Sequence, residues 1–306
     1  MGSSEIRTLP SHPLFPGTSC AFGVFDGLHQ GHRFILEKTL DEAHAQGRTS
    51  MIITFDIDPD EVFAPGKLGK LMSNEDRLTH LAASGVDEVV TIVFDETVRT
   101  MQPERFLDAL FSSGAPKMLF VGEDLRFGCQ ASGDVSLLKA WGDDHGMEVV
   151  ALPLFQQEGH PVTSTRIRAL ISEGKVEEAG RLLGQPFALS GKVVAGRQVG
   201  REMGIATANL QVPAEGLIPA DGVYAGYAIV DGQRFKAAIS VGVPVTFEGV
   251  HNHTVEAHLL GFSGDIYAEE LTLQFIRYLR PMIKFDGPEA LASQIRQDIE
   301  ATSQLP

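Results

Sequence analysis

Residues 22–32 of this chain read Phe22-Gly23-Val24-Phe25-Asp26-Gly27-Leu28-His29-Gln30-Gly31-His32, and this stretch decides the fold around it. The apolar run from Cys20 to Phe25 predicts a buried strand, and the Asp26-Gly27 pair predicts a turn after it. An amphipathic helix is expected to begin near Gly31 and to end at Gly47. A strand that passes through a tight turn into a helix is typical of an α/β fold.

The junction between this predicted strand and helix suits a phosphate group. Free backbone N–H groups and the positive end of the helix dipole lie there, and glycines let a ligand approach the backbone closely. The imidazoles of His29 and His32 can donate to phosphate oxygens, and either can carry a charge near neutral pH. Two plainer interpretations stay open, an ordinary pair of histidines at a helix start and an i, i+3 metal-binding pair.

The pattern G-x-F-D-G-x-H-x-G-H runs from Gly23 to His32 and resembles the HxGH-type nucleotidylyltransferases. In this form it is similar to the adenylyltransferase half of the bacterial bifunctional riboflavin kinase/FAD synthetases. The resemblance implies catalytic roles for His29 and His32. It also implies nucleotide or flavin contacts from Gly23, Phe25, Asp26, Gly27 and Gly31.

Composition sets limits on the class of protein. The 306 residues suffice for two domains, and the formal net charge of −15 argues against nucleic acid or an anionic membrane as the main partner. Cys20 and Cys129 do not form a metal-binding or disulfide-rich pattern, which favours a reducing compartment. The sequence lacks a signal region and a long apolar run. We therefore expect a soluble cytoplasmic protein with small-molecule partners.

Strands and helices are predicted to alternate over the first two-thirds of the chain. Further strands are expected at 49–55, 86–94, 117–121 and 147–155, and helices at 73–85, 103–111 and 134–145. This order predicts a Rossmann-like domain with a parallel sheet, spanning residues 1–186. Ligands bind at the carboxyl ends of such strands. The polar or glycine-rich clusters 26–32, 56–61 and 122–134 are therefore expected to converge.

Two later segments of this half also carry the resemblance. The segment from Gly122 to Asp134 is similar to the family pattern G-x-D-F-x-F-G-x-x-x-x-G-D, which implies that Asp124, Phe127 and Gly128 contact nucleotide or flavin. Ser and Thr at 163–165 predict a helix cap, from which Arg166 or Arg168 could reach a phosphate. The likeness to the motif S-S-T-x-I-R implies binding by Ser164 and Thr165 and a catalytic, triphosphate-holding role for Arg168.

The pattern changes after residue 186. Short β-rich segments at 189–195, 223–230, 235–241, 254–260 and 271–279 predict a small antiparallel barrel or sandwich over residues 187–306. The pair Asp231-Gly232 predicts a two-residue hairpin turn, and a final helix is expected over 288–301.

This second domain contains its own candidate phosphate site. Gly196, Gly200, Arg201 and Gly204 form a glycine-rich loop that could hold a nucleotide. On an extended backbone Thr207 and Asn209 face the same way, and their oxygens suit Mg²⁺. A glycine-rich barrel turn with a solvated Thr and Asn explains the same residues, and the absence of a Walker A pattern excludes a P-loop kinase.

Glu256 lies within an apolar predicted strand and faces the same side as His258. A carboxylate on a strand that lines a site could deprotonate a hydroxyl group. Two alternatives remain open, a solvent-facing strand surface and a metal site formed by His251, His253 and His258.

The order of motifs after residue 186 resembles the riboflavin kinase domain. They are Gly200-Arg201-x-x-Gly204-x-x-Thr207-Ala208-Asn209, Val255-Glu256-x-His258-Leu259-Leu260 and Leu279-Arg280. The resemblance implies that Thr207 and Asn209 hold Mg²⁺ with the nucleotide and that Glu256 is the base toward the ribityl 5′-hydroxyl. It implies a multifunctional transferase of flavin biosynthesis that uses ATP to convert riboflavin to FMN and FMN to FAD.

Two departures from the family pattern lie inside these motifs. Asp58 stands where the motif T-F-D-P-H-P has His, and Ala206 stands where F-P-T-A-N has Pro. The first replaces a potential cation by an acid near the phosphates, and the second removes a fixed φ before Thr207. They keep two alternatives open, an enzyme with one working half and a flavin- or nucleotide-binding regulator that has lost catalysis.

Overall fold

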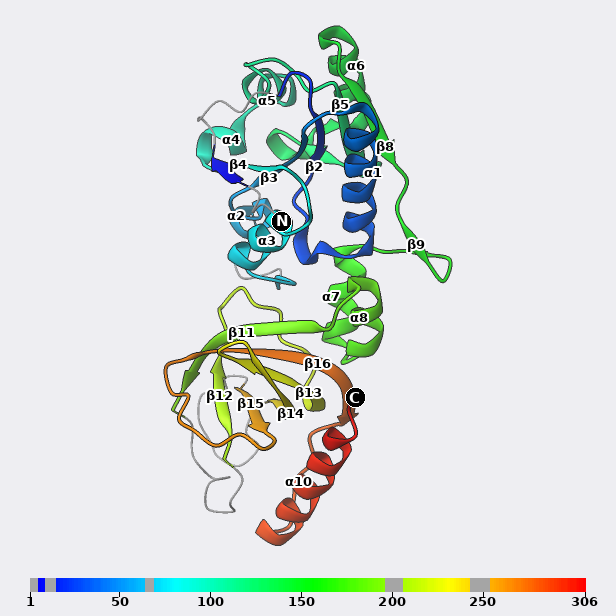
Figure 1. Ribbon diagram of the computed structural model, residues 1–306. Helices are drawn as coiled ribbons and strands as arrows, with labels where there is room; N and C mark the ends of the chain where they lie inside the picture. The colour runs from blue at the N-terminus through cyan, green and yellow to red at the C-terminus, as the bar shows by residue number, and fades with distance from the viewer. Residues whose placement is uncertain (1–4, 9–14, 64–68, 196–205, 243–253) are drawn as a thin grey trace. The chain divides into compact units, whose positions relative to one another are not determined.

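The computed structural model describes residues 5–8, 15–63, 69–195, 206–242 and 254–306. Its contacts divide the chain into two compact units (Figure 1), of which unit 1 is Met1–Leu68 with Met72–Ser164 and unit 2 is Gly69–Leu71 with Thr165–Pro306. The border of the functional domains near residue 186 stays a prediction. Among the residues described, no helix has the length and apolar character needed to cross a membrane.

Unit 1 is built on a six-stranded sheet in the order β1-β4-β3-β2-β5-β8, with every pairing parallel. This confirms the parallel sheet that the alternation of strands and helices predicts. The strands are β1 (Glu5–Thr8), β2 (Ser19–Phe22), β3 (Ser50–Phe55), β4 (Glu88–Ile92), β5 (Met118–Gly122) and β8 (Glu148–Leu152). Two short pairings lie outside this sheet, β6 (Arg126–Phe127) with β7 (Gly133–Asp134) and β9 (Gln156–Gln157) with β10 (His160–Pro161).

Helices cover both faces of this sheet. Phe22 and Ile53 pack in one cluster with residues of α5 and α6, whereas their neighbours Ala21 and Ile52 pack in another with residues of α1 and α3. Successive strand residues point to opposite faces, so each strand contributes to both clusters. The helices are α1 (Gln30–Gln46), α2 (Pro59–Phe63), α3 (Asn74–Ala82), α4 (Glu96–Thr100), α5 (Pro103–Leu110) and α6 (Val135–His145).

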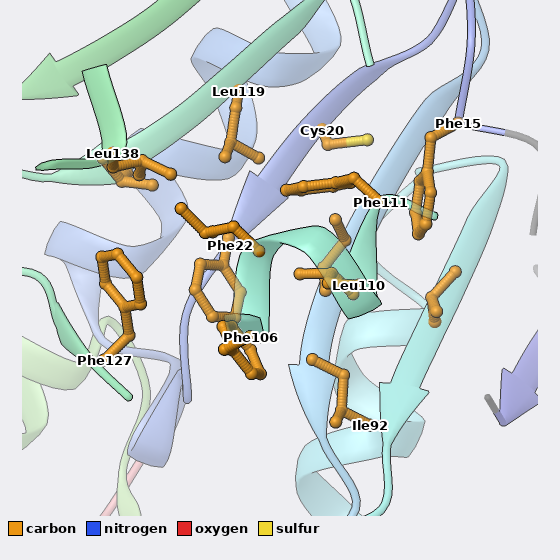
Figure 2. Close-up of a cluster of buried hydrophobic side chains, with 14 of the residues drawn as sticks. Phe15, Cys20, Phe22, Ile92, Phe106, Leu110, Phe111, Leu119, Phe127 and Leu138 are labelled. Carbon is orange, nitrogen blue, oxygen red and sulfur yellow. The ribbon is translucent and has the colours of Figure 1, made fainter. Parts of the chain in front are cut away.

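Figure 2 shows the larger of these clusters, in which aromatic side chains fill the space between the sheet and α5. The ring of Phe22 lies 6.0 Å from that of Phe55 and 6.1 Å from that of Phe106, and Phe106 lies 6.1 Å from Phe127. Burying each such ring contributes roughly 1.5–3 kcal/mol. This core holds the ends of β2 and β3 rigidly beside the loop that contains Phe127.

The strand expected from Cys20 to Phe25 is shorter in the structure. It ends at Phe22 because Phe25 has a left-handed backbone with φ of 61° and so leaves the extended conformation. The edge strand β1 was not predicted, since four residues that include Glu and Arg carry little periodic signal. The helix α1 ends at Gly47, which adopts φ of 62° as expected for a C-terminal cap.

Unit 2 contains a closed antiparallel barrel in the order β11-β12-β15-β14-β13-β16. The barrel confirms one of the two expected architectures and excludes the sandwich. Its strands are β11 (Phe187–Val194), β12 (Ala208–Gln211), β13 (Gly222–Val230), β14 (Gln233–Gly242), β15 (Thr254–Leu259) and β16 (Glu270–Arg280). Three helices of this half are α7 (Ser164–Ser172), α8 (Val176–Leu183) and α10 (Pro288–Ser303).

The hairpin between β13 and β14 has the predicted two-residue turn. Asp231 and Gly232 have φ of 47° and 72°, as a turn that matches the twist of the strands requires. The short strand β12 was not among the predicted strands, and its four residues pair on both sides with β11 and β15. These pairings decide which side chains lie opposite Asn209.

Candidate functional site

The turn after β2 has an unusual backbone. Phe25, Gly27 and Leu28 have φ of 61°, 75° and 41°, and they form the short 3₁₀ turn that leads from the strand to α1. Left-handed φ values at Phe and Leu carry strain, and both side chains are buried, with 2% of their surface exposed. Burial therefore holds a strained turn that leads directly into the amino end of α1.

His29 is the N-cap of α1. Its Nδ1 atom accepts a hydrogen bond from the backbone N–H of His32 at 3.3 Å, so the proton of a neutral ring lies on Nε2. The two rings are stacked, with centroids 3.6 Å apart and planes 16° apart. The cap thus orients the Nε2–H donor of His29 at the amino end of α1.

His32 is held in a neutral state. Burial lowers its pKa well below the ordinary value, and the adjacent His29 ring lowers it further. Its Nδ1 atom is buried without a hydrogen-bond partner in the described part of the chain, although part of the side chain remains accessible. The expectation that either imidazole carries a charge near neutral pH is therefore wrong for His32, because burial disfavours the imidazolium form.

Gly31 is needed because the space beside it is filled. A Cβ atom there would lie 3.1 Å from Cε1 of His29 and 3.3 Å from the carbonyl oxygen of Val162. Nearby, the Ser164 hydroxyl donates to the carbonyl oxygen of Asp26 at 3.1 Å. The structure thus brings residues 162–164 next to residues 25–32, which we call the histidine turn. This is consistent with the prediction that Ser164 belongs to the same site.

The three loops expected to converge follow neighbouring strands. Strands β3, β2 and β5 are adjacent and parallel, so the segments 56–61, 26–32 and 122–134 begin at one edge of the sheet. Asp124 is exposed there, whereas Phe127 is a core residue that is 5% exposed. Gly128 has φ of 72°. The burial of Phe127 gives it a role in packing the loop, and ligand contacts by these residues stay predictions.

The two candidate phosphate arginines of α7 already have partners. Arg168 donates from Nε to the carbonyl oxygen of Gly69 at 2.9 Å, and Arg166 lies 3.4 Å from a carboxylate oxygen of Glu178. Thr165 is exposed in the first turn of the helix. Both contacts lie within unit 2, and the triphosphate-holding role of Arg168 stays a prediction.

In unit 2 the barrel brings two predicted residues side by side. Asn209 of β12 is the register partner of Glu256 on β15, and Glu256 is the partner of Ser240 on β14. Directly opposed residues have Cβ atoms about 5 Å apart on the same face of the sheet. Glu256 and Asn209 are therefore cross-strand neighbours on the same half-buried face of the barrel.

Asn209 of this pair lines a cavity of about 450 Å³, whereas Glu256 is not among its lining residues. Thr207 and His258 also line it. Its other walls mix apolar or aromatic side chains, such as Val193, Phe262 and Tyr267, with the polar Ser263 and Asp265. A hollow that combines aromatic and polar groups is suited to a small molecule.

His258 has a defined role in the backbone beside this cavity. Its Nδ1 atom lies 2.8 Å from the carbonyl oxygen of Ala206, so Nδ1 carries a proton and donates. This bond holds the residue that stands in place of proline just before Thr207. His251 and His253 lie outside the described residues, and those described contain no group of three His, Cys, Asp or Glu side chains placed to bind a metal.

The predicted glycine-rich loop falls in the segment 196–205, outside the described part of the chain. Its four candidate nucleotide contacts, Gly196, Gly200, Arg201 and Gly204, lie outside the residues that the structure describes. Their roles stay predictions.

One buried residue escaped sequence reasoning. Arg77 of α3 is 1% exposed and bonds to the carboxyl ends of both β2 and β3. From sequence alone, an arginine in an amphipathic helix is expected to be exposed to solvent. The signal that could have found it is its helical position, four residues before the buried Leu81 and so on the apolar face.

Comparison with protein families divides the chain in the same order as its motifs. A family model for FAD synthetase matches residues 12–166, and one for riboflavin kinase matches residues 183–305. The first covers the histidine turn and Ser164, and the second covers Thr207, Asn209 and Glu256. Together they account for most of the chain.

Relatives match over almost their whole length. A bifunctional riboflavin kinase/FMN adenylyltransferase of Pseudomonas fluorescens is 32% identical over 96% of this chain and 94% of its own. The Escherichia coli K12 protein of the same name is 31% identical over 96% and 95%. A solved structure from Streptococcus pneumoniae, described as a macrolide-efflux protein, has a TM-score of 0.84 and 30% identity over 95% of both chains. With two family models in order and full-length relatives, the chain belongs to the bifunctional riboflavin kinase/FMN adenylyltransferases.

Proposed function

We propose that this chain makes FAD from riboflavin in two ATP-dependent steps. The barrel half phosphorylates riboflavin to FMN, and the half with the parallel sheet joins FMN to the AMP part of ATP and releases pyrophosphate. The observation that carries the proposal is that each family model covers one phosphate-type cluster of one compact unit, His29 with His32 in unit 1 and Asn209 with Glu256 in unit 2.

In the barrel, we assign Glu256 as the base. Its carboxylate accepts the proton of the ribityl 5′-hydroxyl while that oxygen forms a bond to the γ-phosphorus of ATP and the bond to the β-phosphate oxygen breaks. ADP leaves with that oxygen. Such transfer depends mainly on positioning and charge stabilisation, which the adjacent cavity and the opposed Asn209 support.

The donor set of this cavity fits Mg²⁺. Thr207 and Asn209 both line one cavity and carry neutral side-chain oxygens, and Mg²⁺ commonly combines a few protein oxygens with water and substrate phosphates. When bound, the ion would be held by Thr207 and Asn209 and would neutralise charge on the transferring phosphate. The bond from His258 to Ala206 holds the backbone just before Thr207.

In unit 1, an oxygen of the FMN phosphate attacks the α-phosphorus of ATP, and the bond to the β-phosphate breaks. The Nε2–H of His29 and the positive end of the α1 dipole stabilise the charged oxygens. His32 contributes as a neutral ring, because its pKa is lowered. We assign Arg168 to the phosphates of ATP on the family motif, with no covalent intermediate in the step.

The proposal is tested with purified protein, riboflavin and Mg-ATP, with flavins separated by chromatography. FMN should form first and FAD second, and FMN alone should be converted to FAD. Conversion in only one assay would identify an enzyme with one working half. Tight flavin binding in calorimetry without any product would identify a regulator and would overturn the proposal.

We also propose a cytoplasmic location. Both cysteines are unpaired, with Cys20 buried and Cys129 partly exposed, which is ordinary for a protein of a reducing compartment. The small-molecule partners of the proposed reactions are riboflavin, FMN and ATP. Gel filtration measures the oligomeric state.

A further inference from the structure

Arg77 connects two neighbouring strand ends of unit 1. Its Nη1 donates to the carbonyl oxygen of Val24 at 3.0 Å and to the Thr54 hydroxyl at 2.8 Å. Its Nη2 donates to the carbonyl oxygens of Phe55 at 2.8 Å and Asp56 at 3.2 Å. One planar guanidinium therefore fixes the distance between the segments that follow β2 and β3, which a single-point donor such as lysine cannot do equally.

The Val24 bond acts next to the strained part of the histidine turn. Val24 directly precedes Phe25, whose φ is 61°. The next residue is Asp26, whose carbonyl oxygen accepts a hydrogen bond from the Ser164 hydroxyl. A sparsely populated backbone conformation persists only where the surroundings determine it strongly. Arg77 on α3 is one of the residues that hold this backbone conformation.

Arg77 is also the counter-charge of a buried acidic group. Burial lowers its pKa, while the carboxylates of Asp58, Asp26, Glu61 and Asp56 raise it, in that order. Asp58 and Asp26 are each only 4% exposed. Loss of the guanidinium would remove a positive charge that attracts these carboxylates, and removing one member of a buried group of charges is costly.

This arrangement explains the departure at position 58. Asp58, in place of the family's His, accepts the backbone N–H of Asp60 at 3.0 Å and so caps the short helix α2. Its own N–H donates to Glu61, which also accepts from Asn74 at 2.8 Å. The acid at position 58 therefore has a structural use at the start of α2.

We infer that Arg77 is a positioning residue for adenylyl transfer: the hydrogen bonds of its guanidinium hold the histidine turn against the segment 54–56. It does not touch the reacting atoms in this assignment. The inference rests on the proposed FAD-forming activity of unit 1.

The test compares Arg77→Lys and Arg77→Met in the full-length chain. Trp141, the single tryptophan, lies in the core of unit 1 and reports whether that unit is folded. For folded Arg77→Met we expect kcat for FMN-to-FAD conversion to fall about 100-fold, with little change in the KM for FMN, since a displacement near 1 Å costs this much. For Arg77→Lys we expect about a tenfold fall, because the charge remains but the fork is lost.

A second substitution separates charge from general destabilisation. In Arg77→Met the added change Asp58→Asn should recover about tenfold in kcat, because it removes the largest of the negative charges that Arg77 faced. Arg48→Met is the matched control in the same unit. Arg48 lies 2.9 Å from Glu42, whose other contact is Ser19 at the start of β2, and its loss should leave kcat within threefold.

Each result has a defined meaning. If wild-type protein forms FAD and folded Arg77→Lys and Arg77→Met retain wild-type kcat, the inference alone is overturned. If the loss in Arg77→Met is matched by Arg48→Met, Arg77 has no special positioning role and the inference is also overturned. If wild-type protein forms no FAD from FMN, the proposed adenylyl transfer fails, and the inference fails with it. If Arg77→Met does not fold, the kcat of Arg77→Lys decides.

Discussion

The histidine pair shows how burial alters chemistry that residue identity alone suggests. Two imidazoles at a helix start could act as cations toward phosphate. In the structure they stack at 3.6 Å, one caps the helix through Nδ1, and the other has a lowered pKa. The positive potential at this site then comes from the helix N-terminus and from hydrogen-bond donors, not from an imidazolium at His32.

This burial predicts a pH dependence of stability. The folded-state pKa of His32 lies below the value of about 6.5 in an unfolded chain. The unfolded state therefore takes up a proton first as the pH falls. The stability contribution is complete above about pH 6.5 and is lost below it, at up to about 1.4 kcal/mol per pH unit.

Urea unfolding followed by Trp141 fluorescence at pH 7.5 and 5.5 measures this effect. The fall in unfolding free energy between the two values should be smaller in His32→Asn than in wild-type protein. His44→Asn, an exposed histidine in the last turn of the same helix, should keep the wild-type fall. An unchanged pH dependence in His32→Asn would show that the ring is protonated in the folded state.

Among the elements, α10 illustrates what periodicity leaves open. Its extent was predicted within two residues, at 288–301 against the observed Pro288–Ser303. What it packs against was not. Asp298 of α10 accepts from Arg280 at the end of β16, through Nε at 3.0 Å and Nη2 at 2.7 Å, and from Gln294 at 3.1 Å. This largely buried pair joins the helix to the barrel.

We predict that Asp298→Ala lowers the unfolding free energy of unit 2 by about 3 kcal/mol, because it leaves Arg280 without its buried partner. All four tyrosines lie in unit 2 and the single tryptophan in unit 1. Trp141 fluorescence, excited beyond the tyrosine absorption band, therefore reports unit 1 alone, and a transition in ultraviolet absorbance that this fluorescence lacks is the tyrosine signal of unit 2. The urea concentration at the midpoint of unfolding should fall in the tyrosine signal and stay unchanged in Trp141 fluorescence.

The control for this prediction is an exposed ion pair. Glu96→Ala removes the partner of Arg99 on α4, where both side chains face solvent. Such pairs contribute less than about 1 kcal/mol, so the Trp141 transition should barely move. Equal effects from Asp298→Ala and Glu96→Ala would contradict a special contribution from the α10 pair.

The whole molecule consists of two compact units that each hold one candidate site. Glu256 and Asn209 oppose each other in unit 2, and His29 and His32 stack in unit 1. Both members of each of these two pairs belong to the same unit. The two activities should therefore be separable by single substitutions.

We expect Glu256→Gln to lose FMN formation by 100-fold or more and to keep FMN-to-FAD conversion, as loss of a base costs roughly 10²–10⁴. His32→Ala should show the reverse pattern. A mixture of the two variants should convert riboflavin to FAD, through FMN released by one and used by the other. Failure of the mixture, with each variant active in its remaining step, would show that FMN must be retained by one chain.

The sequence by itself determined the local features of this protein. The alternation of strands and helices, the turn at Asp231-Gly232 and the identity of the phosphate-binding groups depend on residue type and spacing over a few positions. The predicted sheet and barrel were accordingly confirmed. The end of β2 was misplaced, because a left-handed Phe25 is sustained by its buried surroundings and not by its neighbours in sequence.

Only the tertiary structure decided how distant residues meet. Ser164 reaches Asp26 across 138 positions, Arg77 reaches Val24 across 53, and Asn209 is opposed to Glu256 by the pairing of a strand that periodicity had missed. The lowered pKa of His32 likewise depends on burial. The physical reason is that burial and pairing are set by the packing of whole elements, whereas a sequence pattern reports only which groups each element can offer.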